Sequence, residues 1–131
     1  MKRYLADTHA LIWFLSAPGK LGRKARQAFG ALGTTSEIHI STISLWEVAA
    51  LHNAGHLRLR AGFSAWHESL AGLPGIRIEA LSGADVEEAR SLRNLVDPFD
   101  RLIAGTALRL GVPLITRDGR VAKERRVRVV W

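Results

Sequence analysis

Four acidic residues stand in short motifs at widely separated points of the chain, and their side chains could bind a metal ion together. They are Asp7 in LADTH, Glu47 in SLWEV, Asp100 in DPFDR and Asp118 in TRDGR. Carboxylates that converge repel one another by several kcal/mol per close pair, unless some are protonated or a divalent cation joins them. With oxygen ligands and no cysteine in the chain, the expected cation is Mg²⁺ or Mn²⁺, with water completing its shell.

Each aspartate also has an ordinary structural role open to it. Asp7 could cap the helix that follows it, and Asp118 could form a turn with Gly119. In DPFDR, Asp97 is a suitable N-cap and Pro98 suits the first helical position. Asp100 is the third helical residue, where an acid can bond back to the cap or bind a metal.

Glu47 is the least ordinary of the four acids. It lies four residues from Ile43 and four from Leu51 on a predicted helix, so it shares their face and points towards the buried side. A carboxylate there is costly unless a cation or several donors meet it. The alternative to a functional role is pairing with a basic side chain.

Strands alternate with helices along the chain, which predicts an α/β fold with a mainly parallel sheet covered on both faces. Strands are expected at residues 2–7, 37–42, 75–81, 112–116 and 127–131. Helices are expected at 8–17, 21–32, 44–55, 63–70, 82–92 and 98–111, with a short one within 117–125. Thr42 or Ser44 is the expected cap of the third helix, and the first helix is apolar on almost every side, as a buried helix would be. Active sites of such sheets gather beyond the carboxyl ends of the strands, where three of the acids fall.

Length and charge restrict the class of protein. A chain of 131 residues is expected to form one domain, 1–131. Its net charge of +7 favours a polyanionic partner, although a solubilising surface is the alternative. Six cations crowd the C-terminal end: Arg117, Arg120, Lys123, Arg125, Arg126 and Arg128. The lack of cysteine and of any long apolar run leads us to expect a cytoplasmic protein with no membrane association. The four tryptophans are interpreted as core or interface residues, with base-stacking platforms as the alternative.

Four blocks of the sequence resemble, in order and spacing, those of PIN-domain proteins, and among them the VapC-like toxins of toxin–antitoxin pairs. The blocks are YLADTHALIWFL, ISTISLWEVA, DPFDRLIAGTA and PLITRDGRV, and together they span essentially the whole chain. The resemblance implies a three-layer α/β/α fold and a Mg²⁺- or Mn²⁺-dependent endoribonuclease. Carried over by motif, the metal-binding and catalytic acids are Asp7, Glu47, Asp100 and Asp118, while Asp97 begins its helix.

The resemblance also implies partners and supporting residues. An RNA substrate, an antitoxin protein that blocks the site and a homodimer are expected. The hydroxyls of Thr8, Ser44 and Thr116 are predicted to support the acids, with capping and strand-end roles as alternatives. Arg101 and Arg117 are predicted to contact phosphate, or else to face solvent. Two departures from the family pattern are His9, where many members have asparagine, and Leu95-Val96, where histidine often precedes DPFDR.

Other classes fit less well. A response-regulator receiver needs an acidic pair after the first strand, and a haloacid-dehalogenase-type phosphatase needs Asp-x-Asp, whereas this chain has Asp-Thr-His. The remaining alternative is a non-catalytic basic nucleic-acid-binding module of α/β fold, in which the acids are only helix caps.

Overall fold

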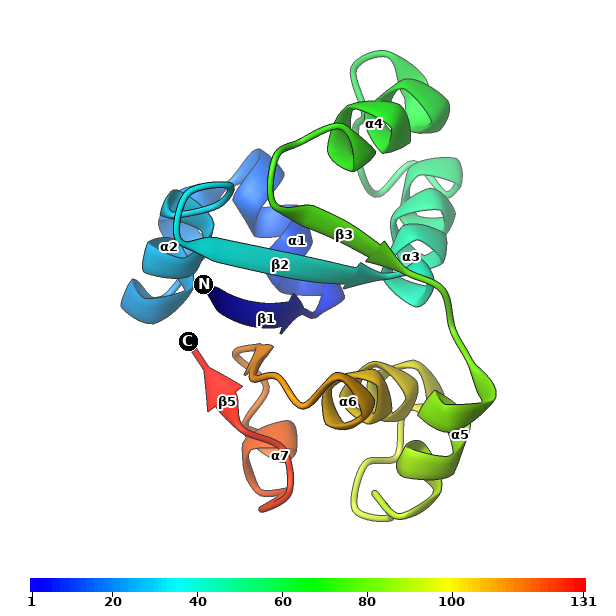
Figure 1. The fold of residues 1–131 in the computed structure, drawn as a ribbon. Coiled ribbons are helices and arrows are strands. Elements are labelled where there is room, and N and C mark those ends of the chain that lie inside the picture. The colour runs from blue at the N-terminus through cyan, green and yellow to red at the C-terminus, as the bar shows by residue number, and fades with distance from the viewer.

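The computed structural model describes residues 1–131 and has a central sheet of five parallel strands with helices on both faces (Figure 1). The strands are β1 (Lys2–Ala6), β2 (Ser36–Ser41), β3 (Ile76–Glu79), β4 (Leu114–Ile115) and β5 (Val129–Val130). The helices are α1 (Thr8–Ser16), α2 (Arg23–Gly30), α3 (Thr42–Asn53), α4 (Gly62–Ala71), α5 (Gly83–Arg90), α6 (Pro98–Leu110) and α7 (Gly119–Ala122), with a 3-10 turn η1 (Pro18–Lys20). The predicted three-layer α/β/α class is confirmed.

The strand order β3-β2-β1-β4-β5 separates the chain into two halves. The first half builds β1, β2 and β3 outward from the centre, and the second half returns to place β4 and β5 on the other side of β1. None of the helices combines the length and the apolar character needed to cross a membrane.

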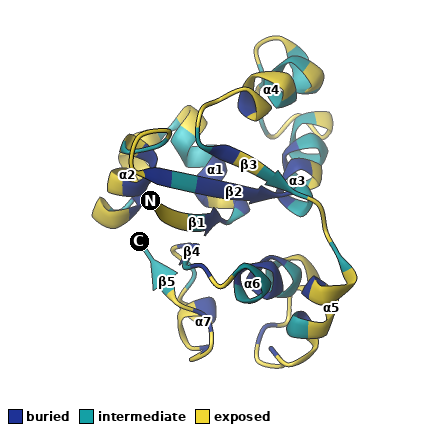
Figure 2. Cartoon of the chain, viewed as in Figure 1, coloured by how far each residue is buried: buried dark blue, intermediate teal, exposed yellow.

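Side chains alternate between the faces of the sheet and so divide the core in two. Ile38 and Ile40 of β2 lie on one face with residues of α1 to α4, and Ile115 of β4 joins them. Leu5 and Leu114 lie on the other face against α6 and the α7 region. Figure 2 shows the result: β2 is largely buried, whereas the outer sides of α2, α4 and α5 are exposed.

Three details differ from the sequence-based expectation. Ser41, and not Thr42 or Ser44, caps α3, because its side chain accepts a hydrogen bond from the Ile43 N–H at 3.0 Å. The first helix, α1, is only partly covered, and Leu15 is exposed. The last two strands pair over two residues each, shorter than the apolar stretches that predicted them.

Helices α5 and α6 pack closely because a glycine lies between them. A Cβ added at Gly105 would come within 2.5 Å of the Asp85 carbonyl oxygen and 3.0 Å of the Ala89 nitrogen. Such distances are too short for a real side chain, so the absence of one sets the spacing of the two helices. Helix α6 ends at Gly111, which adopts the left-handed conformation (φ 68°) that favours glycine.

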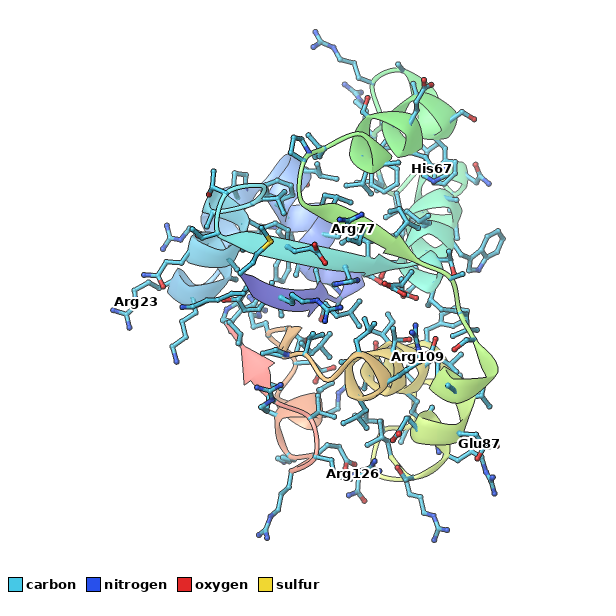
Figure 3. The ribbon with its side chains drawn as sticks, in the orientation of Figure 1. Arg23, His67, Arg77, Glu87, Arg109 and Arg126 are labelled. Atoms are coloured by element: carbon cyan, nitrogen blue, oxygen red, sulfur yellow. The ribbon has the colours of Figure 1, made fainter.

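Charged residues of β2 and β3 lie on the same face of the sheet as Leu5 and Leu114, beside α6. The buried His39 ring lies between two glutamates, with Nε2 3.1 Å from Glu37 Oε1 and Nδ1 2.7 Å from Glu79 Oε1. On α6, Arg109 bonds Glu79 at 3.3 Å and also pairs with Asp85 of α5, whose side chain is fully buried. Figure 3 shows Arg109 on the part of α6 nearest to β3. We call His39, Glu79, Asp85 and Arg109 the compensated network, because every acid in it faces a basic group.

Candidate active site

The predicted acids lie near the point where the order of the strands reverses, between β1 and β4. The chain leaves β1 towards β2 on one side and later enters β4 on the other, so the carboxyl ends of β1 and β4 are adjacent. The Asp7 N–H donates to the Ile115 carbonyl at 3.0 Å, which fixes the two strand ends side by side. Ligands of open parallel sheets bind in the crevice at such a switch point.

Asp7 follows β1 directly and is held from two directions. One carboxylate oxygen accepts the Ala10 N–H at 2.8 Å, so Asp7 also caps α1. Burial raises the pKa of Asp7, while hydrogen bonds from Thr116 and Ala10 act in the opposite direction. The carboxylate of Asp118 adds to the increase.

Glu47 reaches the same region from α3 and is supported by hydroxyl groups. Thr8 donates to Glu47 Oε1 at 2.7 Å, and Ser44 lies 2.9 Å from the Thr8 oxygen. Since the one Thr8 proton goes to Glu47, Ser44 must donate to Thr8. No basic side chain forms an ion pair with Glu47, and burial raises its pKa, followed by the nearby charge of Asp97.

The two aspartates of DPFDR have different roles. Asp97 caps α6 by accepting the N–H groups of Phe99 and Asp100 at 2.9 and 3.1 Å, as predicted. Asp100 does not bond back to the cap, and its carboxylate accepts no hydrogen bond from the protein. Burial, and then the charges of Asp97, Asp118, Glu47 and Asp7, raise the pKa of Asp100 to about 6. Among the four acids, Asp100 is the one whose carboxylate has no hydrogen-bond donor and no basic partner in the protein.

Asp118 is the one acid of the four with a basic partner. It caps α7 through the Arg120 N–H at 2.9 Å, and both its oxygens bond the Arg120 guanidinium, at 3.1 and 3.0 Å. This pairing with Arg120 lowers the pKa of Asp118. The buried Thr116 hydroxyl accepts the Asp118 N–H at 3.1 Å and also bonds Asp7, so it connects two of the acids.

Three of the predicted acids line one open hollow of about 390 Å³, which we call the acid pocket. Its walls are formed by Asp7, His9, Trp13, Asp100, Arg117, Asp118 and Arg120. Glu47 lies outside these walls, although its charge contributes to the raised pKa of Asp100. A larger hollow of about 880 Å³ lies near the start of β1, around Met1 and Lys2, and no acid lines it.

The structure separates the two predicted phosphate-binding arginines. Arg117 lines the acid pocket, whereas Arg101 points to the end of α5 and donates to the carbonyls of Ala89 and Arg90 at 3.1 and 3.3 Å. Arg101 therefore supports helix packing and does not line the acid pocket. Its position beside Asp100 in sequence was misleading, because neighbours on a helix point in different directions.

Trp13 packs against the core, as the sequence predicted, but it also lines the acid pocket, which the sequence reasoning did not predict. The Arg117 guanidinium lies 5.1 Å and Lys20 Nζ 5.9 Å from its ring centre. The available signal was the spacing of four between His9 and Trp13, which puts both on one face of α1 immediately after Asp7. Trp46, 58% exposed on α3, does not belong to the core, and its interface role stays a prediction.

The donor chemistry of this region suits a divalent cation. Carboxylates with raised pKa values and too few positive partners are the hard oxygen ligands that Mg²⁺ and Mn²⁺ prefer. No three acidic or histidine side chains are close enough to enclose an ion by themselves. Mg²⁺ is commonly held by one or two carboxylates with water in its other positions, so the residues present fit such an ion.

Comparison with known proteins assigns the chain to a family. The model of the PIN domain matches residues 4–126. Ribonuclease VapC22 of Mycobacterium tuberculosis is 30% identical over 135 residues, and the alignment covers all of both chains. The chain therefore belongs to the PIN-domain family, as its motifs predicted.

Solved structures share the fold. A chain in a toxin–antitoxin complex from Klebsiella pneumoniae is 25% identical with a TM-score of 0.69, covering 98% of this chain and 96% of that one. A chain in the crystal structure of VapBC2 from Rickettsia felis, bound to a promoter DNA fragment, has a TM-score of 0.74 at 15% identity, covering 98% and 97%. At 15% identity the likeness concerns the fold alone.

Proposed function

We propose that this protein is a divalent-metal-dependent endoribonuclease, the toxin of a toxin–antitoxin pair, with its active site at the switch point between β1 and β4. The observation that carries the proposal is that Asp7, Asp100 and Asp118 line one pocket, where Asp7 and Asp100 have no basic partner and raised pKa values, within a chain of the PIN-domain family. The 30% identity to a ribonuclease over the full chain supports the same activity.

Asp7, Glu47 and Asp100, with Asp118, are the proposed metal-binding and catalytic residues. A bound divalent cation supplies the Lewis acid of phosphodiester hydrolysis, by lowering the pKa of water and offsetting charge on the scissile phosphate. Thr8, Ser44 and Thr116 orient these carboxylates through the hydrogen bonds described above. The family and the oxygen donors support a divalent ion, and we propose Mg²⁺ or Mn²⁺.

RNA is the proposed substrate, and the charge of the protein supports it. The chain carries 19 Lys and Arg against 12 Asp and Glu, and this net positive charge attracts phosphates. Arg117 lines the acid pocket and forms no ion pair, so its guanidinium is available to a phosphate.

Cleavage of a single-stranded RNA with Mg²⁺ or Mn²⁺, and with EDTA as the blank, tests the activity. The substitution Asp100→Asn should reduce the rate at least about 100-fold, because the Lewis acid contributes several kcal/mol to catalysis. Asp97→Asn is the matched control, since asparagine is an equally good N-cap and should leave cleavage nearly unchanged. Equal rates for Asp100→Asn and the native protein would refute the assignment.

A non-catalytic nucleic-acid-binding module is the second candidate, favoured by the caps that Asp7, Asp97 and Asp118 form. Melting temperature in the presence of Mn²⁺ separates the two. Binding to the folded state at 100 times the dissociation constant adds about 2.7 kcal/mol of stability, so the metal site predicts a higher melting temperature. No change at millimolar Mn²⁺ would favour the binding module.

We further propose an antitoxin protein as a partner and a homodimer as the assembly. The similar solved structures include a toxin–antitoxin complex and VapBC complexes, and this supports the antitoxin. Light scattering of the purified chain tests the dimer: the dimer predicts twice the 14.4 kDa chain mass, and a monomer at all concentrations would contradict it.

A further inference from the structure

Besides the three carboxylates, the acid pocket is lined by aromatic and basic side chains. His9 and Trp13 project from the same face of α1, and their ring centres are 5.6 Å apart. The Arg117 guanidinium lies over the Trp13 ring at 5.1 Å, a distance at which a cation is attracted to an aromatic face. We call His9, Trp13 and Arg117 the stacking wall.

The stacking wall is supported from behind, so its geometry is fixed by the fold. Trp131 packs edge-on against Trp13 with ring centres 5.7 Å apart. Trp131 is itself confined, because a Cβ at Gly22 would come within 2.5 Å of it, and its carbonyl accepts the Lys24 N–H at 3.1 Å. Trp13 is thus partly buried, while His9 and Arg117 remain exposed to the pocket.

Arg117 of the stacking wall and the neighbouring Lys20 are free to bind anions. Neither Arg117 nor Lys20 forms an ion pair with any acid of the chain, although Asp7, Asp100 and Asp118 line the same pocket as Arg117. Arg120 is occupied by Asp118, which leaves Arg117 as the arginine of the pocket available to a ligand. A planar guanidinium near an indole can offer a face for stacking and its N–H edge for phosphate.

We propose that the stacking wall is a nucleotide subsite that takes one unpaired nucleotide of the substrate next to the scissile phosphate. The base stacks on the exposed guanidinium face of Arg117 and on the His9 ring, and the N–H groups of Arg117 bind that nucleotide's phosphate. Trp13 is a positioning residue that holds both side chains. The pocket volume of about 390 Å³ falls within the range of about 300–1,000 Å³ found for small-ligand sites.

This subsite would select the form of the substrate and not its sequence. Every base has a face that can stack, so stacking tolerates any base but requires one that is not held in a duplex. The inference rests on the proposed function, because it assumes that an RNA strand crosses the acid pocket.

Binding, measured without cleavage, tests the subsite independently of the nuclease assignment. Anisotropy of a fluorescent single-stranded RNA is recorded with the metal-free protein in EDTA, and is repeated with strands of the same length in which one nucleotide alone keeps its base, or none does. Because the subsite accepts any base, a strand with one base can shift to place it on the stacking wall, so we expect it to bind about 10- to 100-fold more tightly than the fully abasic strand, a difference we call the abasic effect. Equal affinities of these two strands would overturn the proposal.

Two substitutions of Arg117 separate stacking from charge. Arg117→Lys keeps the charge but loses the plane, so it should remove the abasic effect and leave the salt dependence of binding unchanged. Arg117→Gln should also reduce the slope of log affinity against log salt by about one phosphate contact. The same changes at Arg90, which pairs with Glu87 and is 73% exposed on α5, are the control and should preserve the abasic effect.

The role of Trp13 has its own readout. Trp13→Phe should retain most of the abasic effect and Trp13→Ala should lose it, with Trp46→Ala as the control for an exposed tryptophan. Circular dichroism confirms that each variant is folded, and the comparison of the two strands with the native protein needs no variant at all. An abasic effect that survives Arg117→Lys and Trp13→Ala in folded protein would exclude this wall. Loss of RNA cleavage with an intact abasic effect would refute the nuclease and leave the subsite.

Discussion

Two groups of charged side chains, the compensated network and the acid pocket, lie at opposite ends of α6. They differ in whether their carboxylates have basic partners. In the compensated network Glu79 faces His39 and Arg109, and the fully buried Asp85 also pairs with Arg109. In the acid pocket Asp100 has no basic partner, and burial together with the charges of the other acids raises its pKa to about 6.

The difference separates carboxylates whose charge is offset within the fold from carboxylates whose charge the proposed cation would offset. An acid with its base nearby stabilises the packing of α5, α6 and β3. An acid surrounded by other acids costs stability, and such a site persists in proteins where binding or catalysis requires it. Arg120 lines the same pocket as Asp100, but its guanidinium forms an ion pair with Asp118 and none with Asp100.

The largest predicted effect comes from breaking the compensated network. Arg109→Met should lower the free energy of unfolding by about 3 kcal/mol, because it leaves the carboxylate of Asp85 buried without its base. Chemical denaturation measures this change. Arg90→Met removes an exposed pair and should cost less than about 0.5 kcal/mol. Equal effects of the two substitutions would show that burial of Asp85 is not what makes the network important.

Removing an uncompensated charge should have the opposite sign. The folded pKa of Asp100, about 6, exceeds its ordinary value of 3.8, so the folded state binds this proton more tightly than the unfolded state. The stability that protonation contributes is present below about pH 4 and is lost as the pH rises through 6. Asp100→Asn should therefore stabilise the metal-free protein at pH 8 by about 1–2 kcal/mol, after allowance for solvent screening.

Thermal unfolding from pH 4 to pH 8 follows this difference. Glu87→Gln, at a side chain 72% exposed on α5, is the control that should show no such pH dependence. If Asp100→Asn were less stable than the native protein at pH 8, the carboxylate would be compensated after all.

The smallest effect is expected at the one paired acid of the pocket. Arg120→Gln should raise the pKa of Asp118 towards its ordinary range, because the guanidinium bonds that lower it are lost. Since 74% of the Arg120 side chain is exposed, we expect no measurable change in the free energy of unfolding. A carbon-detected NMR titration of Asp118 measures the shift, and an unchanged pKa would contradict the assigned cause.

The sequence predicted those features that depend on neighbours along the chain. Alternating strands and helices predicted the α/β class, and DPFDR predicted a helix that begins at Asp97 and carries Asp100 in its first turn. The spacing of Glu47 to Ile43 and Leu51 predicted that it faces the buried side, but all three are only partly buried, and the buried residues of α3 are Ser44, Leu45 and Val48. The roles of the acids as metal ligands stay predictions.

Contacts between distant segments were not predictable in the same way. His39 and Glu79 are 40 residues apart and meet only because β2 and β3 pair in one register. The position of Arg101 depends on where α5 ends, and that of Trp13 on the loop after β4 that brings Arg117 to it. Even the cap of α3 moved by one residue, because strand β2 continues directly into the helix through Ser41.

The packing of α6 gives Gly105, which has no side chain, an influence on the position of Asp100. Gly105 lies midway along it, about 7.5 Å in helical rise from Asp100, with the α5 backbone against its Cα. A methyl group there would push the two helices apart and carry the Asp100 carboxylate away from Asp7. The position of the Asp100 carboxylate relative to Asp7 is therefore set in part by a residue with no side chain.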